Sequence, residues 1–223
     1  MRFLKTCFPA LVCFVLAGLS ARAADDFSKW EKEIAAFEAA DKISPPPRGA
    51  ILFIGSSSIR FWTTLAQDFP NHKVINRGFG GSQIADSTHF ADRIVWPYEP
   101  RQIVMLCGGN DLNAGKTPPQ VADDFKAFVA RVREKLPDEA IAYISIQPAP
   151  VRWAQREKIV GANRLIEAFT KTGSNLVFID VFSKELTSDG QPNETLFRED
   201  RLHLNAKGYE LLKSIVAPHL GEK

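Results

Sequence analysis

The sequence predicts a doubly wound α/β sandwich, in which helices cover both faces of a mainly parallel five-stranded sheet. Two observations predict this fold. Five short, largely apolar segments recur along the chain, and segments with apolar residues at helical spacing lie between them. Apolar runs bounded by turn residues are typical of strands buried on both faces, and their alternation with helices favours parallel pairing. With 223 residues, 45% of them hydrophobic, the chain is long enough for one such domain.

Residues 1–23 differ from that domain in composition. Arg2 and Lys5 give a positive start, residues 7–19 are mostly apolar, and Ala21-Arg22-Ala23 has the form of a cleavage site. The apolar stretch is shorter than the roughly 20 residues that a membrane-spanning helix needs. We therefore predict a signal peptide cleaved after Ala23, and a periplasmic or secreted protein with no stable membrane anchor.

The composition of the remaining chain argues against nucleic acid as a partner. Without the signal peptide, 25 basic residues face 26 acidic ones, and no basic block or aromatic–basic alternation occurs. Cys107 is then the only cysteine, which rules out an intramolecular disulfide. Because Cys107 ends an apolar run, we interpret it as a small core residue.

The first part of the mature chain, residues 24–48, predicts an amphipathic helix and a proline-rich lead-in. Phe27, Trp30, Ile34 and Phe37 recur at helical spacing within 25–42, before three consecutive prolines. The first strand is expected at 50–54, and a short helix follows Ser56, Ser57 and Ser58. We expect Phe61 and Trp62, in or near that helix, to belong to the core.

The rest of the domain, which we place at 49–223, repeats the alternation of strand and helix. Glycine-rich or polar turns follow the second and third strands, at Gly78–Gly81 and at Gly108-Gly109-Asn110-Asp111. The further strands are expected at 73–76, 102–107, 140–146 and 176–181, and the further helices at 82–96, about 118–132, 156–172 and 205–219.

Reactive side chains follow several of these strands. In an open parallel sheet, groups just beyond the carboxyl ends of the strands lie along one edge. The serines after the first strand, Gly81, Asn110, and Asp200 with His203 in the last loop would meet there. Acyl transfer uses such a set: a serine, a histidine base held by a carboxylate, and donors for the oxyanion.

Each of these residues also has a purely structural explanation. The serines could form a turn and cap the next helix, the glycines could make a turn, Asn110 could cap a loop, and His203 could be a surface histidine. Taken singly, each structural explanation is favoured. Taken together, they would require four independent coincidences along one edge of the sheet.

Four segments resemble the blocks of the SGNH (GDSL-type) hydrolases. They are Phe53-Ile54-Gly55-Ser56-Ser57-Ser58-Ile59, Asn76-Arg77-Gly78-Phe79-Gly80-Gly81-Ser82, Gly108-Gly109-Asn110-Asp111 and Asp200-Arg201-Leu202-His203-Leu204-Asn205. They occur in family order and span nearly all of the mature chain. The resemblance implies a three-layer α/β/α sandwich with a flavodoxin-like sheet of order 2-1-3-4-5. It also implies ester hydrolysis without a metal or other cofactor.

The resemblance assigns a role to each matching residue. Ser57 would be the nucleophile, His203 the base and Asp200 its carboxylate partner. The backbone N–H groups of Ser57 and Gly81 and the side-chain amide of Asn110 would form the oxyanion hole. Ser56 departs from the family pattern, which usually has aspartate there, so the support that aspartate gives the turn is missing.

We therefore expect a serine esterase acting on small-molecule, carbohydrate or lipid esters, with a short acyl or acetyl group favoured. Two alternatives stay open: an acyltransferase using the same triad, and a non-catalytic glycan- or lipid-binding module on the same fold. The segments 184–199 and 82–96 are expected to border the acyl and alcohol pockets.

Overall fold

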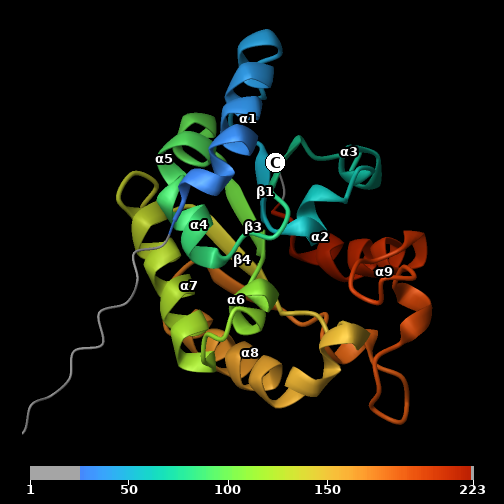
Figure 1. Ribbon diagram of the computed structural model, residues 1–223. Coiled ribbons are helices and arrows are strands. Elements are labelled where there is room, and N and C mark those ends of the chain that lie inside the picture. Colours follow the sequence, from blue (N-terminus) through green and yellow to red (C-terminus); the bar gives the residue numbers. More distant parts are fainter. Residues whose placement is uncertain (1–25, 222–223) are drawn as a thin grey trace, which may run out of the picture.

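A computed structural model describes residues 26–221 (Figure 1), so the predicted signal peptide lies outside the described residues. Its centre is an all-parallel sheet with the strand order β2-β1-β3-β4-β5. This confirms both the fold class and the predicted order. The strands are β1 (Ile51–Gly55), β2 (Val74–Gly78), β3 (Gln102–Leu106), β4 (Ala140–Ile144) and β5 (Leu176–Ile179).

The central strands are buried on both faces, as their apolar sequences predict. Every residue of β1 and β3 is buried. Because successive side chains of a strand point to opposite faces, Leu52 and Ile54 join one hydrophobic core while Ile51 and Phe53 join the other. The sheet therefore separates two cores, and each core needs its own helical layer.

The helical layers differ in size (Figure 1). One core contains side chains from α1 (Glu31–Ile43), α4 (Ile84–His89), α5 (Ala91–Ile94), α7 (Pro118–Arg133) and α8 (Arg156–Thr170). The other contains side chains from α2 (Ser57–Arg60), α3 (Leu65–Asp68) and α9 (Ala206–Val216). Short 3-10 turns cover Ser28–Trp30, Trp96–Tyr98, Pro150–Gln155, Ser183–Glu185, Glu194–Leu196 and Ala217–His219. No helix in residues 26–221 is long and apolar enough to cross a membrane.

Three local predictions need correction. The helix expected at 82–96 is divided into α4 and α5 at Phe90, whose backbone leaves helical geometry while its ring is buried in the core. The segment expected to be a turn after β3 continues as a short helix, α6 (Gly109–Asn113). Trp62 is in the core as predicted, but Phe61 is only half-buried and lies edge-on to the ring of His203.

Candidate active site

The turn after β1 brings its serines to the carboxyl edge of the sheet. Gly55 has φ 142°, and a Cβ at this position would lie 2.1 Å from the carbonyl oxygen of Leu106 in β3. Only glycine permits so close an approach of two backbones. Ser56 then leaves the strand with an extended backbone, and Ser57 begins α2.

Three side chains from two distant parts of the sequence form a continuous chain of hydrogen bonds. The Ser57 hydroxyl oxygen lies 3.0 Å from Nε2 of His203, and Nδ1 of His203 lies 2.7 Å from Oδ2 of Asp200. Because a carboxylate only accepts, the proton of a neutral imidazole belongs on Nδ1. The unprotonated Nε2 then faces the hydroxyl, which is the arrangement in which a histidine can take a proton from a serine.

The backbone around Asp200 fixes its carboxylate. Arg201 adopts the left-handed conformation with φ 57°, and the N–H groups of Leu202 and His203 both donate to Oδ1 of Asp200 at 2.9 Å. The backbone N–H of His203, and then its side chain, lower the pKa of Asp200 to about 2. Asp200 is therefore an anion at every pH well above 2.

The neighbouring serines have different partners. The Ser58 hydroxyl donates to Oε1 of Gln147 at 3.0 Å, and Nε2 of Gln147 donates to Oε1 of the buried Glu185 at 2.8 Å. Ser56 contributes its carbonyl oxygen, which accepts from the N–H groups of Ile59 and Arg60. Among the three serines, Ser57 alone has a hydroxyl within hydrogen-bond distance of His203 in the described structure.

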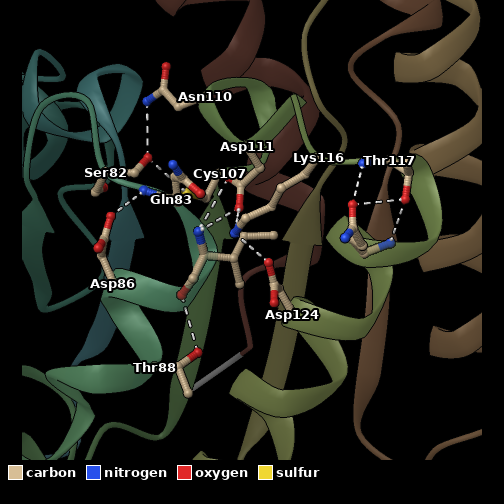
Figure 2. Close-up of polar contacts among 12 residues, drawn as sticks. Ser82, Gln83, Asp86, Thr88, Cys107, Asn110, Asp111, Lys116, Thr117 and Asp124 are labelled. Atoms are coloured by element: carbon tan, nitrogen blue, oxygen red, sulfur yellow. Dashed lines mark hydrogen bonds and ion pairs between the residues drawn. The ribbon is translucent and has the colours of Figure 1, made fainter. Parts of the chain in front are cut away.

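The side-chain amide of Asn110 is held by two neighbours, of which Figure 2 shows Ser82. Its Nδ2 donates to the carbonyl oxygen of Ser82 at 3.0 Å, and its Oδ1 accepts from Nη2 of Arg152 at 2.8 Å. A carbonyl can only accept and a guanidinium can only donate, so these two contacts leave one orientation for the amide. No other acceptor in residues 26–221 bonds to Nδ2, so its second hydrogen remains available to a ligand.

A buried ion-pair network anchors the helix that carries Asn110. The Asp111 side chain is fully buried, and it accepts from the backbone N–H of Ile84 and from Lys116, whose Nζ lies 3.0 Å away. Lys116 also contacts Asp124 of α7 at 2.5 Å (Figure 2). Burial raises the pKa of Asp111, while the charge of Lys116 opposes that increase. The network ties α6 to the start of α4 and to α7.

The glycine predicted for the oxyanion hole lies in a left-handed turn. Gly81 has φ 86°, and a Cβ there would lie 3.2 Å from the ring of Trp30. Within the hydrogen bonds of residues 26–221, the backbone N–H groups of Ser57 and Gly81 donate to no protein acceptor. Both are thus free to donate to a ligand.

A small cavity of about 50 Å³ opens beside Ser57. Its polar side chains include Ser57, Asn110 and Arg152, and its apolar ones include Leu112, Ile146 and Ile159. Its lining contains no residue of 82–96 or 184–199, in contrast to our expectation. Part of the cavity wall is instead formed by the connection after β4, which contains the 3-10 turn Pro150–Gln155. This connection reaches the cavity because β4 ends beside β3 at the same edge of the sheet.

The sequence analysis did not identify two residues, Arg152 and Phe61, as neighbours of the site. Arg152 follows no strand directly, and its proximity to Asn110 depends on the path of the loop between β4 and α8. Phe61 looked like a core residue because its aromatic side chain adjoins Trp62 in the sequence. Because Asp111 adjoins Asn110 in the sequence, its position near the site could be predicted. Its ion pair with Lys116 could be identified only from the structure.

Comparison with known proteins supports the family that the sequence resembles. The model of the GDSL-like Lipase/Acylhydrolase family matches residues 54–211. No curated protein matches the chain.

Solved structures show the same fold at low sequence identity. A protein of Streptococcus pneumonia, provisionally described as a platelet activating factor, superposes with a TM-score of 0.77 at 23% identity, covering 87% of this chain and 94% of that one. A GDSL-like lipase from Bacteroides thetaiotaomicron superposes with a TM-score of 0.69 at 17% identity, covering 87% and 96%. A carbohydrate esterase of family 3 from Talaromyces cellulolyticus gives 0.61 at 16% identity, covering 76% and 94%. Because the family model spans most of the chain, the protein belongs to the GDSL-like lipase/acylhydrolase family, whose members are hydrolases that act on esters.

Proposed function

We propose that the protein is a serine esterase that hydrolyses carboxylic esters with short acyl groups, acting in the periplasm or outside the cell. The observation that carries the proposal is the continuous hydrogen-bonded chain from the Ser57 hydroxyl through His203 to Asp200. A binding module has no need of a base aligned with a serine.

The residues support a two-step reaction. His203 Nε2 takes the proton of Ser57 as its oxygen attacks the acyl carbon, and the ester carbonyl becomes an oxyanion. The N–H groups of Ser57, Gly81 and Asn110 would stabilise this charge. The imidazolium, stabilised by Asp200, then gives its proton to the leaving alcohol, and an acyl-serine remains. Water, deprotonated by the same histidine, attacks the acyl carbon. The bond between this carbon and the Ser57 oxygen then breaks, the oxygen takes the proton back from His203, and the carboxylic acid leaves.

The size of the cavity supports a short acyl group. A site for one water molecule needs about 10–15 Å³ by the same measure, so the cavity of about 50 Å³ has room for only a few atoms the size of water. An acetyl or propionyl group is of that size, whereas a long fatty acyl chain would have to lie outside it.

The test is a panel of aryl esters with acyl groups from acetyl to decanoyl, run on the mature protein with product analysis. We expect kcat/KM to be highest for acetyl or propionyl esters and free acid to be the product. A maximum at long chains would contradict the short-acyl assignment. Acyl transfer to an added alcohol or sugar in preference to water would instead favour the acyltransferase.

The location is a separate proposal, supported by the composition of residues 1–23. Expression of the full chain, fractionation and N-terminal sequencing test it. We expect a periplasmic or secreted protein that begins at Ala24, and an intact N-terminus in the cytoplasm would contradict it.

A further inference from the structure

Arg152 occupies an unusual place in the wall of the cavity. It lies in the 3-10 turn Pro150–Gln155, lines the same cavity as Ser57, and donates from Nη2 to Asn110 at 2.8 Å. Its Nη1 lies only 2.9 Å from the point where a Cβ on Gly109 would be. Because Gly109 has no side chain, the guanidinium of Arg152 can lie this close to the backbone.

The charge of Arg152 has no counter-charge beside it in the part of the chain that the structure describes. Across residues 26–221, no carboxylate lies within ion-pair distance of Arg152, although its side chain is partly buried. The buried Arg77 pairs with Asp41, and the partly buried Arg93 pairs with Glu31. Arg101 and Arg133 also have no carboxylate partner within residues 26–221, but each donates to two backbone carbonyl groups. Removal from water lowers the pKa of Arg152. A partly desolvated cation without a counter-charge costs free energy unless an anion approaches it.

The unused donors of Arg152 suit one class of ligand. Only one guanidinium nitrogen donates to a protein acceptor within the described residues, and that acceptor is the neutral amide of Asn110. A guanidinium presents its remaining N–H groups in a planar fork that matches a carboxylate, a sulfate or a phosphate. The fork lies next to the group expected to bind the reacting carbonyl oxygen.

We propose that Arg152 binds an anionic group of the substrate close to the scissile ester, so that the enzyme prefers negatively charged esters. The proposal rests on the proposed esterase function and names the substrate class for that site. The anionic group can belong to the alcohol or to the acyl part, and matched substrates distinguish the two. If Arg152 only orients Asn110, its loss will instead affect charged and neutral esters equally.

The test compares kcat/KM for two pairs of esters. One pair carries the charge in the alcohol part, 4-acetoxybenzoate against its methyl ester. The other carries it in the acyl part, the 4-nitrophenyl monoester of adipic acid against 4-nitrophenyl hexanoate. We expect wild-type enzyme to prefer the charged member of one pair. Arg152→Gln removes a hydrogen-bonded charge pair with the substrate. It should therefore lower the ratio of kcat/KM for the charged ester to kcat/KM for the neutral one by roughly tenfold to a hundredfold, mainly through KM.

Two further variants complete the kinetic test. Arg152→Lys, which keeps the charge and loses the fork, should give an intermediate ratio. Arg156→Gln is the matched control, since Arg156 is exposed, pairs with Glu157 and does not line the cavity. The proposal is overturned if neither pair shows a charge preference, or if Arg152→Gln leaves both ratios unchanged.

A binding measurement separates this proposal from the esterase function itself. Calorimetry on Ser57→Ala, which cannot turn substrate over, should show tighter binding of the preferred charged ester than of its neutral partner. Ser57→Ala/Arg152→Gln should lose that difference. Charge-selective binding without turnover in wild type would defeat only the proposed function. Turnover of neutral esters with no charge-selective binding would defeat only the assignment of Arg152.

Discussion

The side-chain amide of Asn110 donates to the carbonyl oxygen of Ser82 at 3.0 Å, which links α6, the helix after β3, to the turn after β2. Arg152 completes the orientation of that amide from a third segment. The position of this donor is thus set before any substrate binds. Preorganised donors of this kind need no rearrangement when negative charge develops on the substrate.

Substitution of Asn110 should therefore lower kcat. Removal of one side-chain oxyanion donor costs about 3 kcal/mol, so Asn110→Ala should lower kcat roughly a hundred- to a thousandfold with little change in KM. Asn113→Ala is the control, because Asn113 is exposed at the end of the same helix. Steady-state kinetics on an acetyl ester give the result. A raised KM with unchanged kcat would make Asn110 a binding residue.

If the proposed function is right, Ser57, His203 and Asp200 should act as one unit. His203→Ala should reduce kcat nearly as much as Ser57→Ala, and the double variant should be scarcely worse, because each residue is ineffective without the other. Asp200→Asn should be milder than His203→Ala, since the base is still present. Single-turnover rates for the four variants check this. Effects that add in free energy would contradict a shared step.

The pH dependence follows from the same geometry. The lowered pKa of Asp200, about 2, means that this carboxylate stays ionised and loses its charge only as the pH falls toward 2. The acid limb of kcat/KM should therefore show a single ionisation, to which Asp200 does not contribute, with activity rising as the pH rises. A pH–rate profile between pH 4 and 9 tests this, and an acid limb with two ionisations in that range would contradict it.

Glu185 should make stability depend on pH. Its side chain is fully buried, Oε2 has no hydrogen-bond partner in the described structure, and burial raises its pKa from 4.5 to about 8. As the pH rises from about 4.5 to 8, the unfolded chain loses this proton while the folded chain keeps it. The stability that this group contributes is therefore present below pH 4.5 and lost by about pH 8.

Glu185→Gln should remove that loss. The free energy of unfolding of Glu185→Gln minus that of wild type should be larger at pH 8.5 than at pH 5, by an amount on the order of a few kcal/mol. Glu199→Gln, at an exposed position, is the control. Urea denaturation at both pH values provides the measurement. A difference between Glu185→Gln and wild type that is the same at both pH values would show that Glu185 does not titrate in this range.

The sequence predicted the sheet well because the strands are short apolar runs that end at glycines and polar turns, as at Gly55. It predicted helix boundaries less well where packing decides them. Phe90 interrupts the segment 82–96 because its ring enters the core, and no local pattern marks that break. The site residues that follow strands, such as Ser57 and Asn110, were identifiable from their positions. Arg152 and Glu185 were not, because their surroundings depend on how long loops fold across the sheet.

Labelling with a fluorophosphonate probe, followed by peptide mass spectrometry, tests the central claim most directly, since the probe reacts only with an activated nucleophile. With the mature protein, the label should be on Ser57. It should disappear in Ser57→Ala and His203→Ala, and it should persist in Ser56→Ala and Ser58→Ala. A label on Ser56 or Ser58, or undiminished labelling of Ser57→Ala, would contradict the account.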